Sequence, residues 1–265
     1  MSAVEKAAPA VQLPEIGQPF GGGFFSGITV ENGQRFANIT AGAEHELVGE
    51  WGEYGVKIDG SDSFTDSRAN TEAMAASGSE LAQKVLALDI GGFTDWAIPA
   101  RDVQELQYRH FKPTSRENYC WNRDGDNPNS LPVGLLYAEE SPAKTQVPGF
   151  AEGEPEAFQA RWYWSSSQRS AHHAFSMGFD GGLQLSSAKG HELRVRPVRS
   201  FNALPVQRSG PGLLRLPALE AQQRQRAGFR NGSGAEPDGA TPRPGDRPIP
   251  ARSLYLLRGH PAQAP

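Results

Sequence analysis

Short alternations of apolar and polar residues near the N-terminus predict two strands. The segment GGGFFSGITVENGQRFANITAG (21–42) carries these alternations on both sides of Asn32-Gly33, a dipeptide that strongly favours a tight hairpin turn. A polar, glycine-rich stretch follows, with another turn expected at Asp59-Gly60. The fold is therefore expected to begin with a β-hairpin and an irregular connection.

Apolar residues at helical spacing follow between residues 66 and 92, in DSRANTEAMAASGSELAQKVLALDIGG. Asp66 or Ser67 can cap the start of this helix and Gly91-Gly92 would stop it, while Gly78 weakens the middle and predicts a bend. The segment ARDVQELQYRHF (100–111) predicts a second, shorter helix. The predicted inward positions are Ala73, Met74, Leu81, Val85 and Leu88 in the first helix, and Val103, Leu106 and Tyr108 or Phe111 in the second.

Residues 112–160 are rich in Pro, Asn, Asp and Gly and predict a long irregular insertion. Loops of this length are uncommon in compact domains and are often functional. Strand patterning returns from Arg161 to Phe201, in RWYWSSSQ, HAFSMGF, GLQLSSA and ELRVRPVRSF, with a tight turn at Asp180-Gly181-Gly182. The order of strands, two helices, a long loop and a terminal antiparallel strand block predicts an α+β fold with segregated elements.

Composition divides the 265 residues into three parts. Residues 1–16 are Ala- and Pro-rich and are expected to be a flexible lead-in to a domain at 17–202. Residues 1–202 carry 17 Lys and Arg against 26 Asp and Glu, a balance of −9, whereas residues 203–265 carry 9 Arg against 4 acidic residues. That final part is rich in Pro, Gly and Ala and is expected to be a disordered basic tail. The acidic body has no basic stripe, so we expect no nucleic-acid binding by the folded domain.

Three further features narrow the class of protein. No run approaches the roughly 20 apolar residues of a membrane-spanning helix, so no membrane span is expected. The N-terminus lacks the basic-then-apolar pattern of a signal peptide, which predicts synthesis in the cytoplasm without one. Cys120 is the single cysteine, so no intrachain disulfide can form.

Candidate catalytic and metal-binding residues do not combine into a site. His172 and His173 are adjacent on a predicted strand, so one is expected to be buried and one exposed, and they could not chelate one ion. Asp124–Asn129 (DGDNPN) offers oxygens that suit calcium but lacks the final Glu of a complete calcium loop, and turn composition is the alternative explanation. Ser165–Ser167 lie outside any G-x-S-x-G motif, and no G-x-G-x-x-G is present. We therefore expect no enzyme activity, no metal and no cofactor.

Two segments carry a resemblance to a known family. GGFTDWAIPARDVQELQY (91–108) resembles the Gly-x-x-Asp-Trp-Arg-Leu-Pro-Thr-x-x-Glu-Leu signature of the Lcl C-terminal-like family, and residues 163–199 resemble the closing block of that family. The resemblance spans about residues 17–202 and departs from the family at Ala97–Ala100, in the insertion and in the tail. It implies the C-type-lectin-like fold of the formylglycine-generating-enzyme type. Variable proteins of diversity-generating retroelements and phage receptor-binding proteins share that fold.

The resemblance also implies a rigid frame that carries exchangeable outward side chains, with binding energy coming from a few preorganised groups. The frame positions would be Trp162, Trp164, Ala174, Phe175, Phe179, Gly182, Leu193, Val195 and Val198. The ligand-binding positions would be Arg169, His172, His173, Ser176, Met177, Leu183, Leu185, Ser186, Ser187, Gly190 and His191. The alternative is an undiversified surface that tolerates polar residues.

The function implied is ligand display or host recognition without catalysis, as in a phage or prophage tail protein or a retroelement-diversified variable protein. Its partner would be a protein or glycan receptor on a cell surface, and association with a virion and homo-oligomerisation are both compatible with this role. Two alternatives use the same fold. One is a structural assembly protein, and the other is an enzyme of the formylglycine-generating type, which the single cysteine disfavours because that chemistry needs a cysteine pair.

Overall fold

The structure, a computed structural model, describes residues 12–121 and 123–203. These residues belong to one compact unit of the chain, residues 1–208, and the second unit, residues 209–265, lies outside them. The predicted tail therefore lies outside the described residues except for Ala203. The predicted lead-in is described only from residue 12, and there Leu13 and Ile16 pack against the core, so the packed part of the chain begins earlier than predicted.

The described residues form an α+β fold with three helices, where two were predicted. The predicted helix at 66–92 is broken into α1 (Ser67–Ala76) and α2 (Glu80–Leu86), and α3 (Arg101–Phe111) follows. Asp66 caps α1 as predicted by accepting a hydrogen bond from the Ala69 amide. The break has a physical cause: Gly78 adopts a left-handed φ of +95°, and the Ser79 side chain caps α2 through the Ala82 amide.

The first sheet is built on the predicted N-terminal hairpin. Strands β2 (Gly23–Glu31) and β3 (Gln34–Thr40) pair around Asn32 and Gly33, both of which have positive φ as this tight turn requires. The strand order is β1-β2-β3-β10, and β5 pairs with β2. The other bounds are β1 (Pro19–Phe20), β5 (Ser130–Leu131) and β10 (Val198–Asn202).

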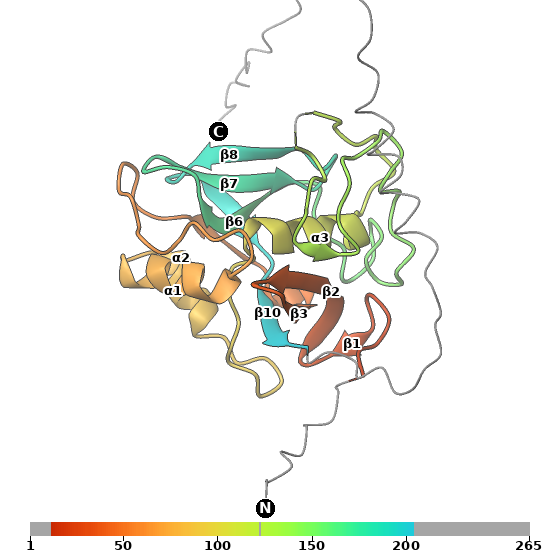
Figure 1. Cartoon of the computed structure of the whole chain (residues 1–265), viewed down its shortest axis with the longest axis horizontal. Coiled ribbons are helices and arrows are strands. Elements are labelled where there is room, and N and C mark those ends of the chain that lie inside the picture. The colour runs from red at the N-terminus through yellow and green to blue at the C-terminus, as the bar shows by residue number, and fades with distance from the viewer. Residues whose placement is uncertain (1–11, 122, 204–265) are drawn as a thin grey trace, which may run out of the picture. The chain divides into compact units, whose positions relative to one another are not determined.

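The second sheet contains the terminal strand block, in the order β4-β9-β6-β7-β8. Its strands are β4 (Leu47–Glu50), β6 (Trp162–Gln168), β7 (His173–Gly178), β8 (Gln184–Ala188) and β9 (Glu192–Val195). Strands β6, β7 and β8 form an antiparallel meander, with β8 outermost (Figure 1). The serines of β6 are fully buried. Ser165, Ser166 and Ser167 each bond to the main chain of another segment, which compensates for the loss of water.

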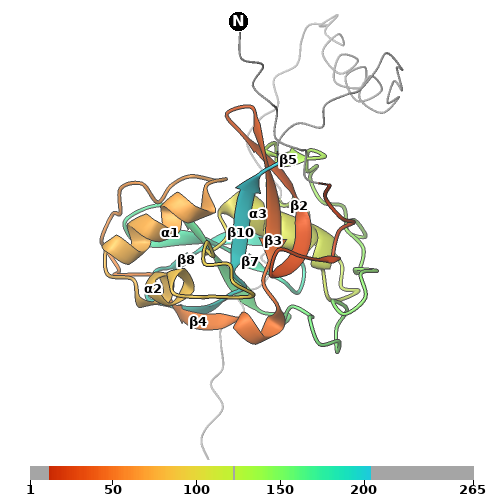
Figure 2. The same ribbon diagram turned by 90° about the horizontal axis from the view of Figure 1, so that it is seen from below.

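Helix α3 lies between the two sheets and contacts β2 of the first and β6 and β7 of the second (Figures 1 and 2). Nine of its 11 residues are buried, including Arg101, Asp102, Gln104, Glu105 and Gln107. The apolar spacing predicted only a one-sided helix. The buried polar side chains bond to the elements around α3, for example Gln104 to the Trp164 carbonyl at 2.7 Å.

Two buried clusters support this arrangement. The larger contains Trp51, Trp96 and Trp164, which are each fully buried, as expected for the frame position Trp164. The smaller, called here the aromatic cluster, joins the insertion to α3 and to β6–β7. It consists of Tyr108, Phe111, Tyr137, Phe150, Phe158, Tyr163, Met177 and Phe179. The insertion at 112–160 is irregular as predicted, but its aromatic residues make it part of the core.

Candidate functional site

Strands β7 and β8 and the turns beside them hold all the predicted ligand-binding positions. Arg169, His172, His173, Leu185, Gly190 and His191 are exposed, and Leu183, Ser186 and Ser187 are partly buried. Two positions contradict the prediction, because only 2% of Ser176 and 1% of Met177 is exposed. Their side chains cannot be part of a displayed surface.

Both corrections have the same cause, because β7 is an inner strand with packed material on both faces. Met177 lies opposite Tyr163 of β6 and belongs to the aromatic cluster. Ser176 lies opposite Trp164, and its hydroxyl is 2.9 Å from the hydroxyl of Ser187 on β8. The resemblance implied that both residues are displayed, but neither face of β7 is open at these positions.

The two adjacent histidines are both exposed, which corrects the expectation of one buried and one exposed ring. His172 precedes β7 and lies in a turn, so strand alternation does not apply to it. Its ring meets that of Tyr54 edge to face, with the ring centroids 4.8 Å apart. His191 comes to the same end of the hairpin, since the Lys189 amide bonds to the His172 carbonyl.

The frame positions are buried at Trp164, Ala174, Phe179, Gly182, Val195 and Val198, and partly buried at Trp162, Phe175 and Leu193. The three arginines of the closing block are structural. Arg194 and Arg196 both pair with Glu46, at 2.6 and 3.1 Å, and Arg199 pairs with Asp95 at 2.6 Å. Strands β9 and β10 are therefore firmly attached to the body.

Besides Leu185, which was a predicted ligand-binding position, the structure exposes four apolar residues that sequence reasoning missed. We call these five residues the apolar patch: Tyr119 (43% exposed), Trp121 (73%), Leu135 (60%), Leu136 (60%) and Leu185 (46%). Four come from the insertion and one from β8. The sequence signal was present as large apolar residues inside a polar loop, but loop composition does not say whether such residues turn inward, as Tyr137 does, or outward.

Asp124 links the segments that carry three members of the apolar patch. Its carboxylate accepts hydrogen bonds from the amides of Trp121 (2.9 Å) and Gln184 (2.8 Å), and its carbonyl accepts one from the Tyr137 amide (2.8 Å). Trp121 is itself a member of the patch, Gln184 precedes Leu185, and Tyr137 follows Leu136. Only 2% of Asp124 is exposed, so the carboxylate is a buried link between the insertion and the edge of the sheet.

A second buried network fixes the insertion to α3. Glu105 accepts hydrogen bonds from Arg109 (2.6 Å), Asn127 (2.7 Å) and the Tyr137 hydroxyl (2.9 Å). Asp102 is bonded to Arg101 at 2.7 Å and to Asn129 at 2.7 Å. Burial raises the pKa of both carboxyl groups, and the neighbouring arginines oppose that shift.

Perturbed carboxyl groups can indicate catalysis, but here the geometry indicates support. Both oxygens of Glu105 are occupied by protein donors, and only 1% of the residue is exposed. A general acid or base must reach the substrate proton within hydrogen-bond distance. This network instead holds the loop that presents the apolar patch.

The calcium candidate at Asp124–Asn129 is built into these same networks. Asp124 bonds to backbone amides, the Asn127 side chain bonds to Glu105 and the Asp102 carbonyl, and the Asn129 side chain bonds to Asp102. Across residues 12–121 and 123–203, no group of three or more His, Cys, Asp or Glu side chains is arranged to hold a metal ion. The side chains of Asp124, Asn127 and Asn129 thus serve the hydrogen-bond networks that hold the insertion.

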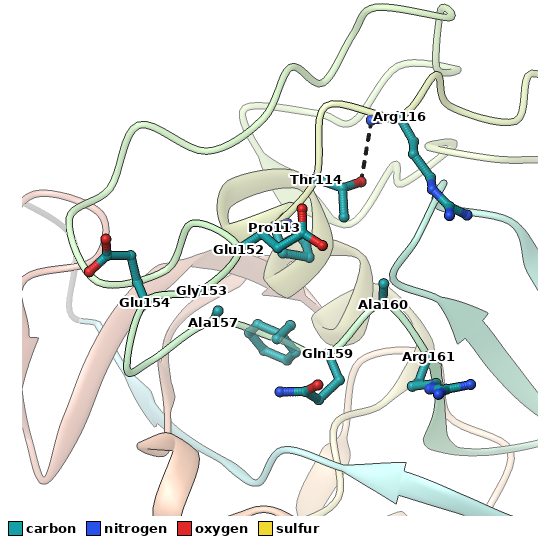
Figure 3. A pocket seen from close by; sticks show the side chains of 11 residues that line it. Pro113, Thr114, Arg116, Glu152, Gly153, Glu154, Ala157, Gln159, Ala160 and Arg161 are labelled. Carbon is teal, nitrogen blue, oxygen red and sulfur yellow. Dashed lines mark hydrogen bonds between the residues drawn. The ribbon is translucent and has the colours of Figure 1, made fainter.

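A pocket of about 640 Å³ lies between the start and the end of the insertion (Figure 3). Thr114 and Arg116 line one part of it and Glu152, Glu154 and Arg161 another. Its charged side chains point in different directions, with Glu154 at the end opposite the two arginines (Figure 3). A wide polar pocket with balanced charge does not favour one ligand class, so the apolar patch remains the stronger candidate site.

Comparison with known proteins does not identify this chain: no protein-family model matches it, and no curated protein matches its sequence. In the part of the chain that the structure describes, no helix is long and apolar enough to cross a membrane.

Proposed function

We propose that the chain is a non-enzymatic receptor-binding protein with a C-type-lectin-like fold, and that its apolar patch contacts a protein receptor. The observation that carries the proposal is that Trp121, Leu136 and Leu185 are exposed apolar residues in three segments that all bond to one buried residue, Asp124. Exposed apolar clusters mark interaction sites in folded proteins. Exposed Trp, Tyr and Leu side chains favour a protein receptor over a highly polar ligand such as a glycan.

Preorganisation supports this assignment. Asp124 and the Glu105 network hold the loop in place before any ligand arrives. A surface that is already ordered loses less conformational entropy on binding, so a larger part of the contact energy appears as affinity. The exposed Arg169, His172, His173 and His191 extend the surface along the hairpin and would supply polar contacts at its rim.

The terminal strand block supports the fold assignment. The segment that resembles the family's closing block, residues 163–199, runs from β6 to the start of β10, and its strands β9 and β10 pair with β4 and β3 from the N-terminal half. The segment that resembles the family signature places Trp96 in the core and starts α3 directly after Pro99 and Ala100. Both segments thus contribute to the packed body, which supports the proposed fold.

A cell-binding experiment tests the proposed function. The fluorescently labelled full chain is incubated with a panel of bacterial strains and measured by flow cytometry, before and after protease treatment of the cells. We expect protease-sensitive binding to at least one strain. Replacing Trp121, Leu136 and Leu185 with Ser should weaken it at least tenfold, because hot-spot side chains carry most of the binding energy.

The matched control replaces Val48 with Ser, since Val48 is exposed on β4 but lies outside the apolar patch. The control should bind like the wild type. Equal binding by the triple variant would refute the patch, and binding that survives protease but is lost after periodate oxidation would refute a protein receptor.

A genomic observation tests the diversified form of this proposal. A retroelement-diversified protein would have a reverse-transcriptase gene nearby and a second copy of codons 161–199 that differs at adenines. Because Ser176 and Met177 are buried, we expect the differences to fall on exposed positions such as Arg169, His172 and Leu185. Changes concentrated on the buried positions would contradict the frame.

A further inference from the structure

Strand β8 forms an edge of the second sheet. It pairs with β7 and is the last strand in the order β4-β9-β6-β7-β8 (Figure 1). An edge strand presents main-chain donors and acceptors that can pair with another strand, and proteins usually blunt such edges with charge, proline or a covering segment. Residues 182–188 (GLQLSSA) contain neither a charged residue nor proline.

The direction of each main-chain group on β8 follows from the register. The Gly178 amide bonds to the Leu183 carbonyl, and the Lys189 amide bonds to the His172 carbonyl. These bonds place the odd-numbered residues of β8 in hydrogen-bonded pairs with β7. The amides and carbonyls of Gln184, Ser186 and Ala188 therefore point away from β7, toward the outer edge.

Two of these six outward groups are satisfied within the chain. The Gln184 amide donates to Asp124 at 2.8 Å, and the Ala188 carbonyl accepts from the His191 amide at 3.0 Å. Within residues 12–121 and 123–203, the other four groups have no hydrogen-bond partner. They are the Gln184 carbonyl, both main-chain groups of Ser186 and the Ala188 amide.

These four groups are complementary to themselves under two-fold rotation. We propose that β8 pairs with β8 of a second copy of this chain, antiparallel, with Ser186 opposite Ser186. The two Ser186 residues would exchange two hydrogen bonds, and each Ala188 amide would donate to the Gln184 carbonyl of the other copy. This register would also set the Gln184 amide of each copy against the Ala188 carbonyl of the other. Both of these groups already have hydrogen-bond partners within their own chain.

Within residues 182–188 the side chains are compatible with this pairing, because these residues are uncharged and Leu185 would lie opposite Ser187. Arg169 donates to the Ser186 hydroxyl at 2.9 Å, so the two Arg169 guanidinium groups would have to turn away from each other at the two-fold axis. The other edge strand of the sheet, β4, differs because Glu50 ends it and Leu81 of α2 lies against Gly49. A two-fold pair at β8 would join the second sheets of the two copies into one continuous sheet. Two-fold symmetry is the closed symmetry that homodimers usually adopt.

This inference does not rest on the proposed function, and its test measures mass instead of binding. Light scattering after size exclusion of the full chain should give twice the monomer mass at micromolar concentration. Ser186→Pro should reduce the mass to that of a monomer, because proline removes the central outward amide while the amides that bond to β7 remain. Ser186→Ala keeps the amide and should remain a dimer.

A monomeric wild type would overturn the proposal, including the case in which residues 204–265 of the same chain cover the edge. A dimeric Ser186→Pro variant with native circular dichroism would also overturn it, because the contact would then lie elsewhere.

If Ser186→Pro fails to fold, cysteine cross-linking decides the question. In a Cys120→Ser background, Ser186→Cys should form an intermolecular disulfide under mild oxidation, since Cα atoms in a hydrogen-bonded antiparallel pair lie about 5.5 Å apart. Ser77→Cys, at an exposed turn between α1 and α2, serves as the control and should remain reduced. Equal cross-linking of the two variants, or none at residue 186, would refute the two-fold pair.

Discussion

Strands β7 and β8 are neighbours in one hairpin and have similar compositions, yet they occupy different environments. Three of the last four residues of β7 are buried and the fourth is partly buried, whereas β8 has no fully buried residue among Gln184–Ala188. Strand β7 is flanked by β6 and β8 and has the aromatic cluster on one face and the larger core on the other. Within the part of the chain that the structure describes, strand β8 pairs with another strand on one side only.

The comparison shows that position in the sheet determines exposure more strongly than alternation along the strand. Alternation predicts one buried and one open face, which holds when a sheet has one open face. Met177 violates that expectation because the insertion and α3 cover the second face of β7. Leu185 lies on an open face as alternation predicts, because the described residues cover β8 less than they cover β7.

The largest expected difference is between Met177 and Leu185. Met177→Ala should lower the free energy of unfolding by about 2–5 kcal/mol, since it leaves a cavity in the aromatic cluster. Leu185→Ala should change it by no more than about 0.5 kcal/mol, as at an exposed site. Chemical denaturation followed by circular dichroism measures both, and equal losses would show that β7 and β8 are packed alike.

A smaller effect is expected at the link between β8 and the insertion. Asp124→Ala should cost about 1–3 kcal/mol, because the amides of Trp121 and Gln184 lose a buried acceptor. Amide hydrogen exchange at Gln184 should accelerate in this variant. Asp126→Ala is the matched control, since Asp126 has only a 3.9 Å ion pair with Arg123. Unchanged exchange at Gln184 would mean that Asp124 does not hold the patch.

The smallest effect concerns the pH dependence of stability and arises from His110, a partly buried residue of α3. His110 bonds to the Ser26 carbonyl at 2.7 Å, and burial lowers the pKa of His110 to about 4 from 6.5. The unfolded chain takes up this proton first as pH falls, so stability present above pH 6.5 is lost toward pH 4.

The expected loss is about 1–2 kcal/mol at pH 5. His110→Gln removes the titrating group, so the stability difference between wild type and variant should shrink between pH 6.5 and pH 5. A difference that stays constant over this range would show that the imidazole titrates equally in both states.

Local features of the sequence determined much of the fold. Asn32-Gly33 sets the first hairpin, Asp66 caps α1, and the spacing of Val103, Leu106 and Phe111 sets α3, since each depends on residues close together in the chain. The large aromatic residues also determined a buried frame, because Trp96 and Trp164 cannot remain in water without a large cost. The terminal strands and the Asp180–Gly182 turn follow from the same local patterns.

Only the tertiary structure decided which side chains reach the surface. Met177 and Ser176 are buried because the insertion and β6 pack on β7, and Trp121 and Leu136 are exposed because Asp124 and Glu105 hold their loop from inside. The open edge at Ser186 likewise depends on the strand order and on the Asp124 contact at Gln184. These properties arise from contacts between residues far apart in the chain, which apolar spacing and turn composition do not encode.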